Sequence, residues 1–183
     1  MNKFVSVWPG LKPRSLKLYP QASIFVRLFF VVLLQFLIIN SMVMAAEVRI
    51  PVASDFEQDG KKGLYSNAVI LLYFSAPDCR YCMKLEEAVL KPMLRSGGYD
   101  KKVLLRQIDW RSPAIVNDFF GQRVSLYKLS ERYDVKVTPT LVFVDSNGRE
   151  VAPRILGFQS ADFFWHYLDQ RIRQSRTAMN SGS

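Results

Sequence analysis

The feature that most constrains this chain is a short apolar segment followed closely by its only two cysteines. Residues 68 to 74 form a continuous apolar run with the length and composition of a buried strand. Residues 75 to 77 end the run, and Cys79-Arg80-Tyr81-Cys82 stands where a helical pattern begins. Two residues between the sulfurs allow the first turn of a helix to hold both cysteines on one side, near N–H groups that lack helical partners. The spacing therefore predicts a reactive cysteine pair.

Other uses of two cysteines fit this sequence less well. A zinc site needs three or four protein ligands, and His166 is the only histidine in the chain. Covalent haem attachment requires a histidine directly after the second cysteine, where the chain has Met83. We expect no metal and no bound cofactor. A purely structural disulfide remains an alternative, although so short a loop would add little stability.

The first 46 residues have the layout of a secretory signal. Residues 1 to 27 contain five basic and no acidic residues, and an apolar block from Leu28 to Ile39 follows. Ala45 and Ala46 predict cleavage after one of them. An uncleaved membrane anchor is the alternative, because residues 28 to 46 approach the roughly 20 residues that a membrane helix needs. In both cases we expect the domain to lie in the periplasm or to be otherwise exported, in an oxidising compartment.

Residues 47 to 183 should form one domain. This part retains all 16 acidic and 20 of the 25 basic residues, so its net charge is +4. That excess is too small to indicate a nucleic-acid partner, and we expect none. The length suits a single hydrophobic core without disulfide cross-links, and we expect a monomer.

The elements after residue 47 alternate between strand and helix patterns. We predict strands at 68–74, 102–109, 140–144 and 149–156, and helices at 83–94, 125–133 and 160–174. Residues 55–64 should form a weakly helical or irregular lead-in to the first strand. Pro92 should bend or end the first of these helices, and residues 145–148 should form a hairpin turn. Most of the segment between 109 and 138 shows no clear pattern. This order predicts an α/β fold with a central mixed sheet of about four strands flanked by helices.

A second candidate site is Thr138-Pro139-Thr140, where a proline stands at the beginning of a strand. We predict a cis peptide bond before Pro139. The Thr138 backbone would then face the sulfurs and could pair with an extended substrate segment. Without the cysteine pair, an ordinary strand-entry proline would explain this residue equally well.

Together these motifs resemble the thioredoxin superfamily over residues 68 to 172. The stretch from Ser75 to Cys82, the long segment from Asp109 to Thr138 and the residues around Pro139 most resemble the exported, SoxW-type thioredoxin-like proteins. The resemblance implies a thioredoxin fold, a cis Pro139, Cys79 as the nucleophile and Cys82 as the resolving thiol.

Several residues depart from the pattern of cytosolic thioredoxins. Asp78 replaces a tryptophan, and Arg80-Tyr81 replaces a Gly-Pro pair, so we expect these three residues to tune the pKa of Cys79. The helix N-terminus should favour the Cys79 thiolate, while the charges of Asp78 and Arg80 roughly cancel. The result should be a lowered but not extreme pKa.

The proton acceptor of the second cysteine also differs. Tyr73 stands where thioredoxins have a buried acid, and Leu105 replaces the lysine that accompanies it. Either a residue distant in sequence, such as Glu86 or Asp109, substitutes through water, or solvent takes the proton of Cys82. Of these, we expect solvent.

The leading interpretation is an exported thiol–disulfide oxidoreductase that reduces protein disulfides through Cys79 and Cys82. Its partners would be protein thiols and disulfides, together with an unidentified upstream redox partner in the membrane. Two alternatives remain open. One is an oxidase that introduces disulfides with the same site, and the other is a peptide-binding module whose cysteines form an inert disulfide.

Overall fold

The computed structural model describes residues 20–40 and 47–181, and the chain divides into two compact units, Met1–Ala46 and Glu47–Ser183. The described part of the first unit, residues 20–40, is the helix α1 (Pro20–Asn40), which includes the apolar block from Leu28 to Ile39. Within the described residues, no helix combines the length and the apolar character that crossing a membrane requires. The predicted cleavage positions after Ala45 and Ala46 lie outside the described residues.

The second unit is built on a four-stranded sheet. Its strands, in spatial order, are β2 (Val103–Asp109), β1 (Val69–Ser75), β5 (Thr140–Val144) and β6 (Glu150–Leu156). β1 pairs in parallel with β2 and antiparallel with β5, and β5 pairs antiparallel with β6. Pro153 lies in β6, at the edge of the sheet, where a missing N–H is tolerated. The predicted mixed sheet of about four strands is therefore confirmed.

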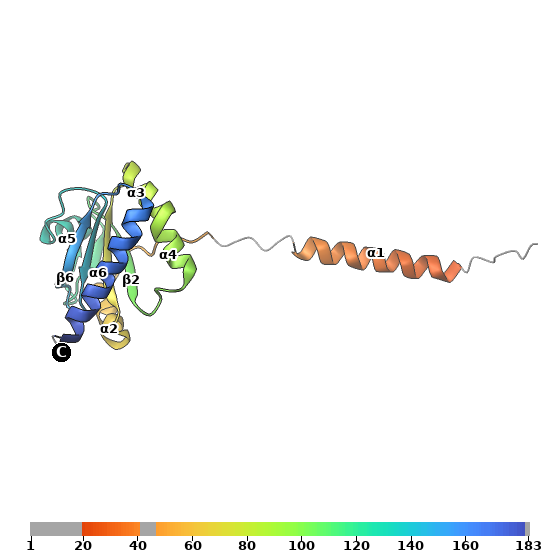
Figure 1. Ribbon diagram of the computed structural model, residues 1–183, viewed down its shortest axis with the longest axis horizontal. Helices are drawn as coiled ribbons and strands as arrows, with labels where there is room; N and C mark the ends of the chain where they lie inside the picture. Colours follow the sequence, from red (N-terminus) through yellow and green to blue (C-terminus); the bar gives the residue numbers. More distant parts are fainter. Residues whose placement is uncertain (1–19, 41–46, 182–183) are drawn as a thin grey trace, which may run out of the picture. The chain divides into compact units, whose positions relative to one another are not determined.

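Helices cover both faces of this sheet (Figure 1). One face is packed by a helical run and by the C-terminal helix: α3 (Arg80–Leu85), η1 (Glu86–Leu90), α4 (Lys91–Ser96) and α6 (Ala161–Ser181). The other face is packed by α2 (Phe56–Ser66) and α5 (Leu126–Arg132). Of the predicted helices, the last continues to Ser181, seven residues beyond its expected end at Gln174.

β1 is the centre of the structure because it contributes side chains to both cores. Leu71 and Tyr73 belong to the cluster beneath α3 and α6, whereas Leu72 and Phe74 belong to the cluster beneath α2 and α5. This division follows from the two-residue period of a strand. All seven residues of β1 are buried, and each large apolar side chain contributes roughly 1.5–3 kcal/mol of burial. The end of β1, from which the cysteine segment continues, is therefore firmly positioned.

Of the two effects predicted for Pro92, bending or ending its helix, the ending does not occur. The chain passes from α3 through a π-helical turn, η1, into α4, and Pro92 lies in the first turn of α4. The Lys91 N–H donates to the Glu86 carbonyl, five residues earlier. This wider turn admits a residue whose nitrogen cannot donate a hydrogen bond, so the helical run continues to Ser96.

The unclear segment after Asp109 contains a small hairpin that the sequence pattern did not reveal. Its strands, β3 (Ile115–Asn117) and β4 (Arg123–Ser125), have three residues each. The buried Asp118 carboxylate holds the turn, because it accepts the N–H groups of Phe120 and Gln122 and a hydrogen bond from Arg132. Strands this short carry too few residues for a recognisable alternation, and a buried aspartate is not visible in the sequence.

Candidate active site

The two cysteines lie at the N-terminus of α3 and form a disulfide. Their sulfurs are 2.11 Å apart and their Cα atoms 5.2 Å apart. Cys79 is the N-cap residue, with extended backbone angles, and its Sγ accepts a hydrogen bond from the Cys82 N–H at 3.1 Å. This is the bond that a capping side chain makes with a free N–H of the first helical turn. The predicted placement of the cysteine pair at a helix start is therefore confirmed.

The two cysteines differ in their access to solvent. Cys79 is half-buried, whereas Cys82 is 1 % exposed and packs in the apolar core beneath α3 and α6. The difference arises because Cys79 precedes the helix while Cys82 lies within its first turn, on the side facing the sheet. A sulfur from another molecule can therefore reach Cys79 but not Cys82.

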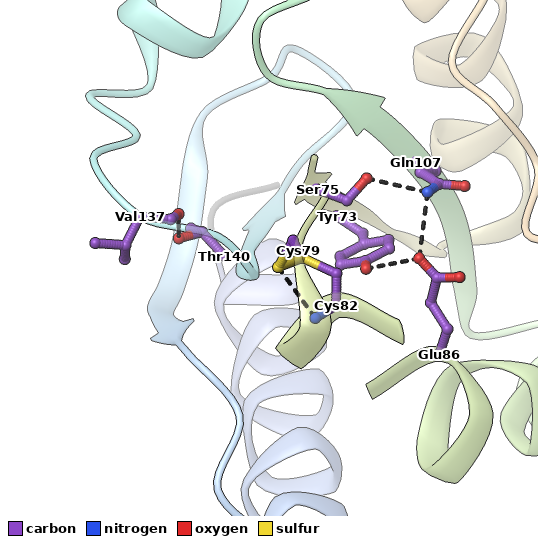
Figure 2. The surroundings of a disulfide bond; sticks show 8 residues. All are labelled: Tyr73, Ser75, Cys79, Cys82, Glu86, Gln107, Val137 and Thr140. Atoms are coloured by element: carbon purple, nitrogen blue, oxygen red, sulfur yellow. Dashed lines mark hydrogen bonds between the residues drawn. A yellow bond between two sulfur atoms is a disulfide. The ribbon is translucent and has the colours of Figure 1, made fainter. Parts of the chain in front are cut away.

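The Thr138–Pro139 segment lies at the same end of the sheet as the cysteines. Thr140 pairs with Phe74, near the end of β1, and Figure 2 shows Val137 and Thr140 in the surroundings of the disulfide. The peptide bond before Pro139 is cis. Pro139 is buried and its carbonyl accepts the Gly157 N–H at 2.8 Å. Within residues 47–181, the N–H and C=O of the half-buried Thr138 have no hydrogen-bond partner.

The three residues expected to tune Cys79 lie on the surface around it. Asp78 and Arg80 are exposed, and neither forms an ion pair with another described residue. Tyr81 is 56 % exposed, and Lys84 Nζ lies 5.8 Å from the centre of its ring. None of these contacts involves Cys79 Sγ. The influence of the three residues on the pKa of Cys79 therefore stays a prediction.

Beside the disulfide, a partly buried group of polar side chains lies between β1, β2 and η1 (Figure 2). The Tyr73 hydroxyl donates to Glu86 Oε1 at 2.8 Å. The Gln107 amide donates to the same oxygen at 3.3 Å and to Ser75 Oγ at 3.0 Å. Burial, and secondarily the nearby Glu86 carboxylate, raise the pKa of Tyr73 far above its ordinary value. The phenol therefore stays protonated and acts as a hydrogen-bond donor to Glu86.

A cavity of about 230 Å³ connects this polar group with the second cysteine. Its lining includes Ser75, Cys82, Glu86, Gln107 and Asp109. Both carboxylates named from the sequence as substitutes for the missing buried acid thus face one space with Cys82. The bonds from Tyr73 and Gln107 to Glu86 were not foreseen. The one sequence signal for this cluster is the four-residue spacing between Cys82 and Glu86, which places them on one side of a helix.

The remaining metal-binding side chains show no clustering in the described part of the chain. His166 is exposed on α6, with its ring 5.9 Å from that of Tyr167. Among the described residues, no group of three histidine, cysteine, aspartate or glutamate side chains is placed to hold a metal ion.

Comparison with known families gives a match that covers most of the second unit. The model of the thioredoxin-like domain matches residues 56–172, a range that begins with α2, contains the whole sheet and ends within α6. No significant match is found among curated proteins.

Solved structures include several with a similar chain path. A DsbH oxidoreductase has 15 % identity and a TM-score of 0.51, covering 72 % of this chain and 91 % of its own. The reduced periplasmic thioredoxin SoxS from Paracoccus pantotrophus has 23 % identity and a TM-score of 0.43, covering 58 % of this chain and 98 % of its own. A poplar thioredoxin h has 18 % identity and a TM-score of 0.42, covering 62 % and 86 %. The first likeness supports the fold alone, and the SoxW-type resemblance stays a prediction.

Proposed function

Since this chain belongs to the thioredoxin-like domain family, we propose that it is a thiol–disulfide oxidoreductase that reduces protein disulfides through Cys79 and Cys82. The observation that carries the proposal is the unequal burial of two bonded cysteines at a helix N-terminus. Cys79 Sγ is accessible to other molecules, whereas Cys82 Sγ is buried behind it. A purely structural role explains this disulfide less well. A bond that closes a loop of two intervening residues adds little stability to the fold.

The reaction begins with the reduced pair. The Cys79 thiolate attacks one sulfur of a substrate disulfide, forming a mixed disulfide and releasing the other substrate sulfur as a thiolate. The Cys82 thiol then loses its proton and attacks Cys79 Sγ. The Cys79–Cys82 bond forms, the mixed disulfide breaks, and the second substrate sulfur leaves as a thiolate. The substrate disulfide gains two electrons, and the cysteine pair loses them to become the disulfide seen in the structure.

The direction of the reaction depends on how strongly the protein stabilises the reduced pair. A strongly oxidising pair requires a heavily stabilised Cys79 thiolate, since that lowers the free energy of the reduced form. Within the described residues, the Cys82 N–H is the one donor hydrogen-bonded to Cys79 Sγ, and the opposite charges of the exposed Asp78 and Arg80 on either side of Cys79 roughly cancel. This modest stabilisation favours a reductase over an oxidase.

Substrate binding is proposed at Thr138. Its N–H and C=O lack partners within the described domain, so an extended substrate segment could pair with both of them as an added strand. Backbone pairing of this kind does not depend on the substrate's side chains, which suits an enzyme that acts on several protein disulfides.

Export is proposed from the basic segment and apolar block that precede residue 47. Outside the cytoplasm the pair would need a source of electrons, which we place in an upstream redox partner in the membrane. Mass spectrometry of the protein from an envelope fraction tests the export, because a cleaved signal leaves a chain beginning at Ala46 or Glu47. Recovery of the full-length chain from the cytoplasm alone would contradict it.

Replacing Cys82 with serine should trap the substrate. Cys79 still attacks, but no second thiol resolves the mixed disulfide. We therefore expect a covalent adduct between C82S and a disulfide-bonded test protein such as insulin, visible by non-reducing electrophoresis and released by dithiothreitol. C79S, in which the remaining thiol is buried, should form no adduct. Failure of C82S to form one would contradict the proposed function.

A further inference from the structure

We propose that Glu86 accepts the proton of Cys82, through water in the cavity that both residues line, and that Tyr73 and Gln107 position its carboxylate. The inference rests on the proposed reductase function, because only the resolving step requires Cys82 to lose a proton. It replaces the expectation that solvent takes this proton.

The need for an internal acceptor follows from burial. Cys82 is 1 % exposed, so bulk water does not reach its sulfur directly. The adjoining cavity of about 230 Å³ has room for several water molecules, each of which occupies about 30 Å³ in the liquid. Its lining includes the polar side chains of Ser75 and Gln107 and two carboxylates, Glu86 and Asp109. A carboxylate is a much stronger base than water, and one or two waters can carry the proton to it.

The geometry favours Glu86 for this role. Glu86 follows Cys82 by one helical turn, so their side chains lie on the same side of the helical run, and Glu86 is the first residue of the π-helical turn. Tyr73 and Gln107 both donate to Oε1. Oε2 has no partner among the described residues. One oxygen is therefore held in place, and the other is available to a water in the cavity.

Asp109, the other carboxylate of the cavity, is a weaker candidate. Its Oδ1 accepts the N–H of Arg111 at 3.2 Å, within the turn that follows β2. Neither Tyr73 nor Gln107 donates to it, because both are bonded to Glu86. The Asp109 carboxylate is thus hydrogen-bonded to the local backbone, while the donors of the partly buried cluster, Tyr73 and Gln107, both bond to Glu86.

The proton is conserved through the cycle. Cys82 gives it to a cavity water as its sulfur attacks the mixed disulfide, and the water passes a proton to Glu86. The protonated Glu86 returns it to solvent after the substrate has left. No electrons pass through Glu86, so its replacement alters the rate of resolution without changing which bonds form or break.

Single-turnover kinetics of the full-length reduced protein test the inference. The protein is mixed with a disulfide-bonded peptide, and acid quenching measures the mixed disulfide and the Cys79–Cys82 disulfide over time. In E86Q we expect the mixed disulfide to form at the wild-type rate and to resolve at least about tenfold more slowly near pH 6. The deficit should shrink as rising pH increases the fraction of Cys82 thiolate. E87Q, which alters an exposed carboxylate of the same turn, should behave as wild type.

Two further variants separate proton transfer from structural damage. E86D keeps a carboxylate and should resolve faster than E86Q. Y73F removes the positioning bond, and its resolving rate should acquire the steeper pH dependence of E86Q. Resolution in E86Q as fast as in wild type would overturn the inference while leaving the reductase function intact. A wild-type protein that forms no mixed disulfide would instead overturn the proposed function.

A readout without turnover completes the test. In C79S the single remaining thiol is Cys82, and thiolate absorbance near 240 nm follows its titration. Because the Glu86 carboxylate opposes a second negative charge in the same cavity, Glu86→Gln in this background should lower the pH at which Cys82 ionises. Glu87→Gln should leave that pH unchanged. Equal titration midpoints in C79S with and without Glu86→Gln would show that Glu86 does not act on Cys82.

Discussion

Replacing Cys79 with serine should reduce the rate of dithiol-dependent disulfide reduction to the uncatalysed background, a loss of about a thousandfold or more. Cys79 is the one cysteine accessible to another molecule, since Cys82 is buried behind it. A serine hydroxyl at this position cannot attack a disulfide at neutral pH, and the one remaining thiol of the chain, Cys82, is buried. The measurement is the turbidity assay of insulin reduction by dithiothreitol, with the protein at catalytic concentration.

The matched control for C79S is E87Q, which changes an exposed residue of the adjoining helical turn. It should retain the wild-type rate. If C79S retained a substantial part of that rate, the surface sulfur would not be the nucleophile, and the peptide-binding interpretation with an inert disulfide would gain support.

The second large effect concerns stability. Asp59 in α2 accepts two hydrogen bonds from Arg106 in β2, from Nε at 2.7 Å and Nη2 at 2.5 Å. Asp59 is 3 % exposed, and the side chain of Arg106 is mostly buried. Asp59→Ala leaves a guanidinium in a poorly solvated position, so we expect the free energy of unfolding to fall by about 3 kcal/mol. That is a large fraction of the stability of a domain of this size, and urea unfolding followed by circular dichroism measures it.

Two variants define the origin of this loss. Lys61→Ala removes an exposed ion pair with Glu57 in the same helix, and it should shift the unfolding midpoint little. Replacing Asp59 and Arg106 together with leucine and methionine removes both charges and should restore much of the stability. If Asp59→Ala unfolded at the wild-type urea concentration, the pair would not be holding α2 against the sheet.

The parts of the fold that could be predicted are those recorded in local sequence patterns. The apolar run of β1, the helix start at Cys79 and the hairpin turn at Asn147–Gly148 each follow from the composition and order of neighbouring residues. The sequence could not decide whether the helix ends at Pro92 or continues past it, because the continuation depends on a π-helical turn whose hydrogen bonds span five residues. The hairpin of β3 and β4 was missed because the buried Asp118 that holds it is indistinguishable in the sequence from a surface aspartate.

The candidate site shows the same division. The cysteine spacing and the substitution of Tyr73 for a buried acid are visible in the chain. The hydrogen bond that Tyr73 makes is not visible in the chain. Its hydroxyl reaches Glu86, thirteen residues further along the sequence, only because β1 packs against η1. Gln107 joins the pair from β2 through the parallel register that aligns it with Tyr73. This partly buried hydrogen-bond network thus depends on tertiary packing that no local pattern specifies.

The reduction potential of the Cys79–Cys82 pair, measured by equilibration with a glutathione redox buffer, decides most directly whether this protein reduces disulfides. A reductase with one N–H bonded to its surface sulfur should have a potential near that of thioredoxin, about −270 mV. A value near −120 mV, typical of a strong disulfide-introducing oxidant, would contradict the proposed direction and assign the same site to oxidation.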